Sequence, residues 1–282
     1  MKKRGQKVSR GVKKICFWVV VALIFAIQIY PIVWLIIASF RTNSELATNP
    51  FGSLEHLTIE NYIDVIQNSN VFIYLKNSAF VTCVALVFVV MFSFMAAFAI
   101  SRIRFKAKNL LFSYFIMGLT IPPFVTLIPL YVMFSKMGLL DTHMALVLVY
   151  IAFNLPISIL LFVNFYKYIP EELSEAAILD GCSVYGIYFR IFVPLSKNTI
   201  LTVLSMSFIG VWNDYLFSLL FINSTSLKTV SLGMQDFISE TGYRVWGSTF
   251  ATICITTVPT LIIYFALNKK VSGGMTLGAT KG

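Results

Sequence analysis

Charged side chains are scarce in this sequence. Only 12% of its 282 residues are Asp, Glu, Lys or Arg, about half the share that soluble globular domains carry. Apolar residues make up 58% of the chain, and the mean hydropathy is +0.82. This balance excludes an ordinary water-soluble domain.

Histidine and cysteine are also rare. The two histidines, His56 and His143, lie far apart and show no metal-ligand spacing. The four cysteines, at positions 16, 83, 182 and 254, share no close spacing, which speaks against a disulfide framework or a zinc site. The nucleotide-binding pattern G-x4-G-K-[ST] is missing as well. We therefore expect no catalytic residue, no metal site and no cofactor in this chain, and no enzyme.

Long apolar runs are abundant. Six of them reach the roughly 20 residues that a helix needs to cross a bilayer, at about 17–40, 77–100, 109–134, 143–166, 198–222 and 248–268. The first run is too long for the apolar part of a signal peptide, and no convincing cleavage site follows it. Because no internal repeat or low-complexity linker is evident, we expect one all-α domain, residues 1–282, with six transmembrane helices.

The net charge of +10 is distributed unevenly. If the N-terminus lies in the cytoplasm, the inside segments hold 17 basic residues and the outside segments hold 5. This asymmetry follows the positive-inside rule and predicts a multi-pass protein of a cell membrane with both termini in the cytoplasm. The pooled charge alone could suggest nucleic acid, but its position beside the spans indicates contact with anionic lipid instead.

One polar island between the apolar runs carries four carboxylates within ten residues. They are Glu171, Glu172, Glu175 and Asp180, in the expected cytoplasmic loop 167–197. Pro170 suits the first position of a helix, acids are favoured in its first turn, and Gly181 is a natural end. We expect a second short helix from Ser183 to Phe192, ended by Pro194.

The first of these helices can serve as a docking element. Leu173, Ala176 and Ala177 fall on one helical face, and small alanines let a helix approach a groove on a partner closely. Glu175 and Asp180 can then reach basic groups or backbone donors on the groove wall. The alternative is an amphipathic loop on the inner membrane surface, which four acids disfavour because anionic lipid repels them.

Asp214 is the only acid inside an apolar run. A carboxylate in the membrane costs roughly 2.5–3.5 kcal/mol on insertion scales and is a functional candidate by default. Trp212, Asn213 and Tyr215 flank it, so the cluster offers polar groups for sugar hydroxyls and aromatic faces for sugar C–H patches. Hydration near the outer surface and a structural bond to a partner are the alternatives, and both stay open.

Prolines interrupt the third apolar run at Pro122 and Pro123. Backbone groups freed by proline must line a cavity or meet a neighbour, and the hydroxyls of Thr120 and Thr126 could satisfy them. We expect this span to form part of the wall of a substrate pathway. A plain packing kink is the alternative.

Four segments together resemble one family. The loop from residue 175 reads EAAILDGCSVYGIYFRIFVP, the third run contains TIPPFVTLIPLYVMFSKMGLLDT, the fifth contains VWNDYLFSLLF, and the chain ends in GGMTLGATKG. They resemble permease subunits of type I ABC importers, in particular the maltose-permease type of the oligosaccharide branch. The resemblance covers the chain from about residue 57 to its end, and Val193 departs mildly from the leucine that is usual there.

The resemblance implies a set of partners. They are a second, homologous permease, two cytoplasmic ATPase subunits or domains that bind ATP and Mg, and an extracytoplasmic sugar-binding protein. The candidate docking residues for the ATPase are Glu171, Glu172, Glu175, Ala176, Ala177, Asp180, Gly181, Ile191 and Pro194. The tail 269–282 is expected to be extended, since glycine holds a helix poorly, and to reach toward the ATPase interface through Gly273, Gly274, Gly278 and Lys281.

The expected function is ATP-driven import of a carbohydrate by alternating access. An oligosaccharide such as an α-galactoside or a maltodextrin is the expected substrate. Permeases for other solutes, such as glycerol phosphate or polyamine, share the loop and remain alternatives. A secondary transporter would show paired intramembrane charges and repeats, which a single Asp214 does not supply.

Overall fold

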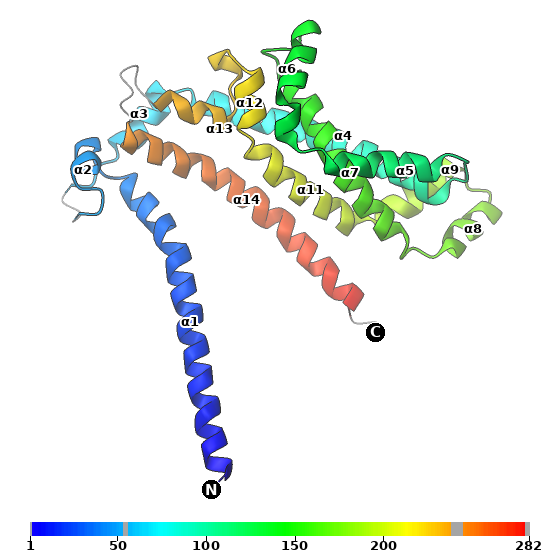
Figure 1. Ribbon diagram of the computed structural model, residues 1–282, viewed down its shortest axis with the longest axis horizontal. Helices are drawn as coiled ribbons and strands as arrows, with labels where there is room; N and C mark the ends of the chain where they lie inside the picture. Colours follow the sequence, from blue (N-terminus) through cyan, green and yellow to red (C-terminus); the bar gives the residue numbers. More distant parts are fainter. Residues whose placement is uncertain (1, 53–55, 238–244, 280–282) are drawn as a thin grey trace. The chain divides into compact units, whose positions relative to one another are not determined.

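The computed structural model describes residues 2–52, 56–237 and 245–279, and its regular structure is helical (Figure 1). Within these ranges there is no β-strand, only an isolated bridge between Arg41 and Leu57. The all-α fold class is therefore confirmed.

The α-helices are α1 Lys2–Ala38, α2 Asn43–Thr48, α3 Glu60–Asn68, α4 Val71–Arg102, α5 Lys108–Met117, α6 Leu127–Lys136, α7 His143–Tyr166, α8 Glu171–Leu179, α9 Val184–Ile187, α10 Val193–Leu195, α11 Lys197–Trp212, α12 Leu216–Phe221, α13 Val230–Gly233 and α14 Trp246–Ala279. Short 3₁₀ turns cover Gly118–Thr120, Pro123–Thr126, Thr225–Leu227 and Met234–Phe237. One turn of π-helix covers Tyr188–Phe192.

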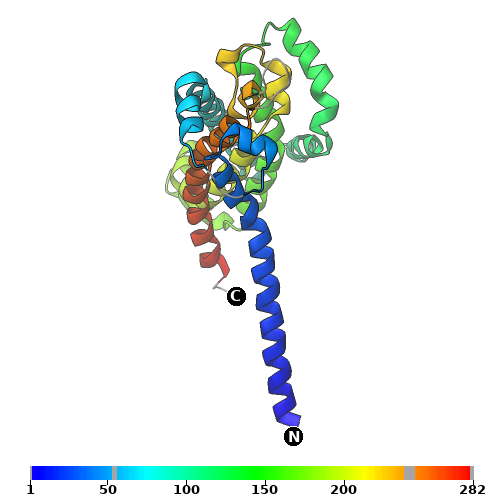
Figure 2. The same cartoon turned by 90° about the vertical axis from the view of Figure 1, so that its left-hand side faces the viewer.

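Four helical stretches in the described part of the chain are long and apolar enough to cross a membrane unbroken: Lys13–Ala38, Val71–Arg102, His143–Tyr166 and Trp246–Ala266. Two further pairs pass the same test only as bent spans. Lys108–Thr120 and Pro123–Lys136 meet at 93°, and Val184–Leu195 and Lys197–Trp212 meet at 71°. Counting each bent pair as one span gives up to six spans, and Figure 2 shows the turn between α5 and α6. The second pair differs from the expected fifth span, 198–222, because its first half, Val184–Leu195, lies in the expected cytoplasmic loop and its second half ends at Trp212.

By packing, the chain divides into two compact units. The first holds residues 1–69 and 235–257, and the second holds residues 70–234 and 258–282. The predicted single domain is not decided by this division and stays a prediction. Each unit is described by itself below.

In the second unit, α4 and α7 pack along each other and carry the largest apolar core. Phe94 of α4 meets Phe162 and Tyr166 of α7 edge to face, with ring centroids 5.0 and 5.5 Å apart. Edge-to-face aromatic pairs are stabilising beyond the area they bury. This core continues into the loop after α7 through Ile169, Ala177, Ile187 and Phe192, so the loop is attached to the spans by apolar packing.

At its other end the same unit is fastened by Asp141, which lies in the turn between α6 and α7. Its backbone amide donates to the Phe221 carbonyl at 2.7 Å, and its carboxylate accepts the amides of Asn223 and Ser224 at 2.9 and 2.8 Å, together with the Ser224 hydroxyl. The bonds from Ser224 and Asn223 hold the pKa of Asp141 below its usual value, although partial burial opposes this. Asp141 has φ of 56°, a left-handed conformation that Asp tolerates better than most residues.

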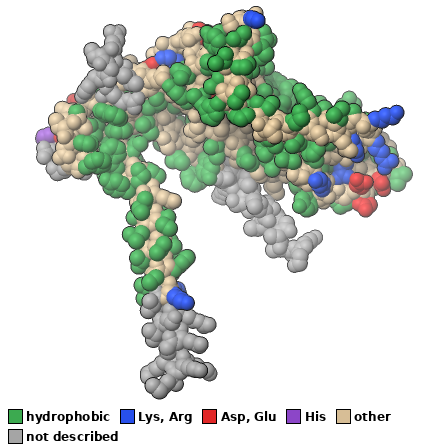
Figure 3. Space-filling view, viewed as in Figure 1, with side chains coloured by type: hydrophobic (Ala, Val, Ile, Leu, Met, Phe, Trp, Pro, Cys, Tyr) green, Lys and Arg blue, Asp and Glu red, His purple; other side chains and the backbone are tan. Residues whose placement is uncertain are grey.

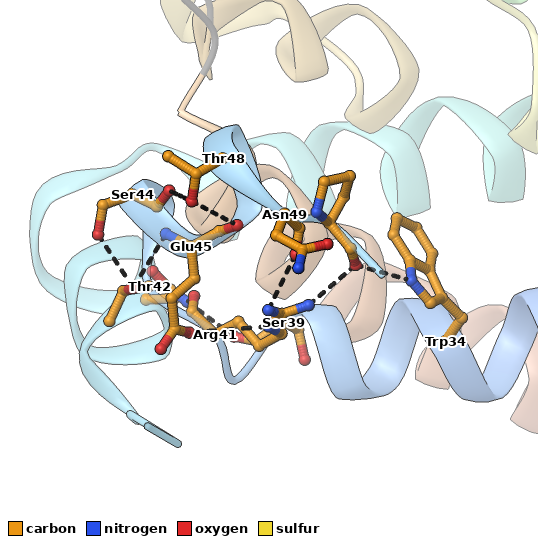
Figure 4. Close-up of polar contacts among 10 residues, drawn as sticks. Trp34, Ser39, Arg41, Thr42, Ser44, Glu45, Thr48 and Asn49 are labelled. Atoms are coloured by element: carbon orange, nitrogen blue, oxygen red, sulfur yellow. Dashed lines mark hydrogen bonds and ion pairs between the residues drawn. The ribbon is translucent and has the colours of Figure 1, made fainter. Parts of the chain in front are cut away.

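In the first unit, α1 exposes apolar side chains along most of its length, as the space-filling view shows (Figure 3). This suits a helix in contact with lipid. After α1 the chain folds around Arg41, which is only 4% exposed. Its guanidinium donates to the carbonyls of Pro50 and Asn49 at 2.9 and 3.0 Å, and its Nε lies 3.7 Å from a Glu45 carboxylate oxygen (Figure 4).

The end of the chain differs from the expectation. Instead of an extended tail from residue 269, α14 continues to Ala279. A glycine costs a helix roughly 1 kcal/mol relative to alanine, but extending an existing helix avoids the unfavourable nucleation step. Gly273, Gly274 and Gly278 therefore lie on a helical backbone, whereas Lys281 lies outside the described residues.

Candidate functional site

The helix α8, Glu171–Leu179, opens the loop that follows α7. Pro170 is its N-cap rather than its first residue, a shift of one position, and Glu171 and Glu172 occupy the first turn as expected. Both acids are exposed. In Figure 3 acidic and basic side chains gather at the end of the molecule where α8 lies.

The end of α8 is set by Gly181, as the sequence predicts. Gly181 has φ of +78°, and its amide donates to the Ile178 carbonyl at 3.0 Å while the Cys182 amide donates to the Ala177 carbonyl at 2.9 Å. These two bonds form a Schellman motif, which pairs the carbonyls left free at a helix end. The chain therefore turns sharply after α8 without leaving these two carbonyls unpaired.

Only one of the two alanines of α8 is exposed. Ala177 is 8% exposed and belongs to the core of the second unit, next to Ile187 and Phe192. Ala176 is exposed. The expectation that both alanines are presented to a partner is thus wrong for Ala177, because the rotation of α8 is set by packing onto its own spans.

Most of α8 is exposed, and four of its exposed residues at helical spacing form what we call the α8 stripe: Glu172, Glu175, Ala176 and Leu179. Residues at i, i+3, i+4 and i+7 share one side of a helix, and all four are exposed. Leu179 is 88% exposed, and exposed Asp180 continues the stripe beyond the helix end. Leu173 and Ile178 of the same helix are also exposed, at 45% and 61%, and neighbouring exposed apolar side chains mark a surface that meets another protein.

Arg102, the last residue of α4, holds the base of this loop. Its Nη2 donates to the carbonyls of Tyr166 and Ile169 at 2.7 and 2.6 Å, and its Nη1 lies 3.7 Å from a Glu171 carboxylate oxygen. The guanidinium carbon lies 5.1 Å from the centre of the Phe192 ring, within cation–π range. The sequence indicated Arg102 only as one of the inside charges, because its partners lie more than sixty residues away.

The second helix of the loop differs from the expected Ser183–Phe192. Ser183 caps α9, accepting the Gly186 amide at 3.2 Å, but α9 gives way after Ile187 to the π-helical turn and then to α10. Pro194 does not end the helical path. It lies in the first turn of α10, where its missing amide is tolerated, and it is exposed, while Ile191 packs against the core.

The residues around Asp214 point in different directions. Trp212 ends α11, is 6% exposed and packs against Phe208 at a ring distance of 5.5 Å. With Leu86 and Ile263 it lines an apolar cavity of about 500 Å³. Asn213 is exposed and donates to the Ile209 carbonyl of its own helix at 2.9 Å.

Asp214 itself is half-buried and bonded within the chain. Its Oδ2 accepts the hydroxyl of Tyr150 on α7 at 2.7 Å and the backbone amide of Ser218 on α12 at 3.2 Å. The Ser218 hydroxyl lies 3.3 Å from that of Tyr150, and Thr229 donates to Ser218 at 3.1 Å. These bonds lie within the chain, which neither of the open alternatives anticipated, and they support a structural role for Asp214 inside its own fold. Tyr215 is half-buried against the neighbouring apolar core.

The break in the third span lies at the predicted prolines. Pro122 and Pro123 are exposed at the 93° bend between α5 and α6. The hydroxyls of Thr120 and Thr126 donate to the carbonyls of Met117 and Pro123 at 2.8 and 2.7 Å, so both threonines bond backbone groups beside the bend. An apolar cavity of about 480 Å³ lies beside the bend, with Gly118, Ile121, Phe134, Val149 and Phe153 in its wall.

Over residues 89–272 the chain matches the family described as the binding-protein-dependent transport system inner membrane component. That stretch includes the α4–α7 core, the α8 stripe and Asp214. The chain belongs to this family. The resemblance seen in the four sequence segments is thereby confirmed, and the family is a membrane component of a transport system.

Among curated relatives in this family, the chain is 39% identical to the ABC transporter permease ORF2 of Caldicellulosiruptor sp. (strain Rt8B.4), with 89% of this chain and 91% of the relative aligned. It is 32% identical to the trehalose/maltose transport system permease MalG of Thermococcus litoralis, over 96% and 98% of the two chains. It is 29% identical to the diacetylchitobiose uptake system permease NgcG of Streptomyces coelicolor, over 89% and 84%.

A solved structure shares the fold. A chain of a bacterial ABC transporter that imports the acidic polysaccharide alginate superposes with a TM-score of 0.80, covering 93% of this chain and 97% of that one. Its sequence identity is 20%, so this likeness concerns the fold alone.

Proposed function

We propose that this chain is the permease subunit of an ATP-driven importer, in which it forms half of the translocation pathway beside a second, homologous permease. The observation that carries the proposal is the α8 stripe. It presents carboxylates and Leu179 outward on a loop that Arg102 and the Gly181 turn hold against the spans. We propose that this stripe docks in a groove of a cytoplasmic ATPase.

The cargo of the proposed importer is an oligosaccharide. The relatives named for trehalose and maltose and for diacetylchitobiose support this substrate class. A solved structure of the alginate transporter includes a periplasmic protein with a bound pentasaccharide, which supports an extracytoplasmic sugar-binding protein as a partner. Within this class, an α-galactoside or a maltodextrin remains our proposal.

The energy source lies outside this chain. Nucleotide and Mg would be bound by the partner ATPases, whose closure would move α8 and, through Ala177, Ile187 and Phe192, the α4–α7 core into which the loop packs. Such a movement would open the pathway to alternate sides of the membrane. In the proposed orientation both termini and the 167–197 loop are cytoplasmic, as the 17 basic residues on that side indicate.

The first test is recovery of the chain from its native membrane in mild detergent, followed by mass spectrometry of the proteins that come with it. The proposal expects a second multi-span permease, a P-loop ATPase and a sugar-binding protein. Recovery of the chain alone, stable and homomeric, would contradict it and favour a self-contained transporter. A deletion of residues 171–180 is the matched control and should lose the ATPase while keeping the second permease.

A further inference from the structure

A small cavity lies at the base of the α8 loop, between the end of α4, the start of α5 and the end of α7. Its volume is about 290 Å³. The polar part of its wall includes Ser101, Arg102, Lys108, Lys167 and Glu171. Three cations thus face one carboxylate, and that carboxylate already lies 3.7 Å from Arg102.

Two residues of the cavity wall carry an enclosed polar atom that has no hydrogen-bond partner in the described parts of the chain. The Arg102 side chain is 10% exposed, yet its Nε has no partner among the described residues, nor does the enclosed hydroxyl of Ser101. A polar group that is buried without a partner is unfavourable, because it has lost its hydrogen bonds to water. Unpaired donors beside lysines favour an anion as the missing partner.

The start of α5 adds to this preference. Lys108 is its first residue and Asn109 its second, both in the cavity wall. The Lys108 amide donates to the Phe105 carbonyl at 3.4 Å, but the N-cap Ala107 has no side chain that could pair the next amides. Free amides at a helix N-terminus attract anions such as phosphate. The Lys167 ammonium donates to Asn164 at 3.0 Å, which leaves two of its three N–H groups for a ligand.

The remaining wall is apolar and includes Ile100, Phe112 and Val163. A free phosphate gains nothing from such a wall, whereas the acyl chains of a lipid do. We propose that this cavity binds the phosphate of an anionic lipid headgroup from the inner leaflet. The proposal rests on the orientation in the proposed function, which places the ends of α4 and α7 at the cytoplasmic surface.

The experiment uses the full chain, purified with whatever subunits accompany it, and native mass spectrometry with added phosphatidylglycerol. We expect selective retention of phosphatidylglycerol over phosphatidylcholine. The double variant Lys108→Gln/Lys167→Gln should weaken retention about fivefold for each lysine removed. Lys106→Gln is the matched control, since Lys106 is exposed in the same loop but is not part of the cavity wall, and it should retain lipid like the unaltered chain.

Three outcomes would overturn the proposal: equal retention by the double variant, equal loss in the Lys106→Gln control, or displacement of the lipid by an equal concentration of inorganic phosphate. The last would mark a site for a free anion. Lipid retention is measured without transport, so the two proposals can fail separately. If the partner proteins are recovered but lipid binding is not selective, only the proposal of a lipid site is refuted. If lipid binding is selective but no partner protein is recovered, only the proposed importer function is refuted.

Discussion

The α8 stripe and Asp214 use the same chemical group in opposite ways. Glu172 and Glu175 are exposed on a short helix, whereas Asp214 accepts the Tyr150 hydroxyl and the Ser218 amide inside the chain. In the sequence, Asp214 is the stronger candidate for a functional residue, because a carboxylate within an apolar run is costly. The structure indicates that the surroundings of a carboxylate, more than its rarity, show whether it serves the fold or a partner.

The substitution Glu175→Lys gives the strongest test of the proposal that the α8 stripe serves a partner whereas Asp214 serves the fold. If the stripe docks on an ATPase, reversing this charge should abolish sugar uptake, a fall of more than about tenfold, since like charges in a buried contact cost several kcal/mol. Uptake and recovery of the ATPase would be measured together. Exposed Glu60, on α3, provides the control: Glu60→Lys should leave both unchanged. Normal uptake by Glu175→Lys would sink the docking assignment.

Arg102→Ala removes the group that holds the loop in place. Hydrogen bonds from a charged donor are worth roughly 1.5–3 kcal/mol each, so losing two should destabilise the protein by about 3–6 kcal/mol. Hydrogen exchange at residues 168–180 should rise while the core of α4 and α7 stays protected. Arg102→Lys keeps the charge but not the planar fork and should be intermediate. If exchange does not change, Arg102 does not hold the loop.

A double-mutant cycle decides the role of Asp214. Tyr150→Phe should cost about 1.5–3 kcal/mol of stability, since a bond to a carboxylate is lost, and most of that cost should vanish in the Asp214→Asn background. Thermal unfolding in detergent measures each corner of the cycle. If Asp214→Ala instead leaves stability unchanged and lowers sugar uptake, Asp214 lies on the substrate pathway. The contrast drawn here between Asp214 and the α8 stripe would then be wrong.

Gly181→Ala tests the turn that ends α8. A left-handed conformation costs a non-glycine residue about 1–2 kcal/mol, and since no atom lies within 4 Å of the added Cβ, the cost is conformational. Gly186→Ala is the matched control, because Gly186 lies in α9 and its Cβ would be 3.6 Å from the nearest side-chain atom. The control should be neutral or stabilising. Equal losses in both variants would contradict the argument.

The smallest expected effect is the loss of stability at low pH that follows from protonation of Asp141. Its folded pKa is lowered from 3.8, so its contribution is fully present above that value and is lost as the pH falls through the folded pKa. We expect less than about 1 kcal/mol, because the carboxylate is largely solvated. Melting temperatures between pH 3 and pH 6 should converge for the unaltered chain and Asp141→Asn at the acid end. A constant gap would exclude this titration.

The apolar runs predicted most of the fold because length and hydropathy alone define a span, and Pro122 and Pro123 predicted where one span bends. The break at Asn213–Tyr215 was not predicted, since a few polar residues do not interrupt an apolar average. The inward rotation of Ala177 could not be predicted either, because it depends on the core that α8 meets.

The partners of the charged residues were the least accessible from the sequence. From the sequence, Arg102 is only one of the inside charges, and its bond to the Tyr166 carbonyl is known only from the structure. Likewise, Tyr150 is one aromatic residue in an apolar helix, and only the structure shows that its hydroxyl lies 2.7 Å from Asp214. Each pair is separated by more than sixty residues. Local pattern fixes local conformation, but such contacts arise only once helices have packed.

The turn at Asp141 has a mechanical consequence. A single carboxylate collects two backbone amides and a hydroxyl from the segment after α12, and its own amide returns a bond to Phe221. These bonds therefore hold the end of α6, the start of α7 and the end of α12 together as one rigid unit. Any opening movement at this surface has to occur at the edges of that unit, because separating its three parts would require breaking four hydrogen bonds at once.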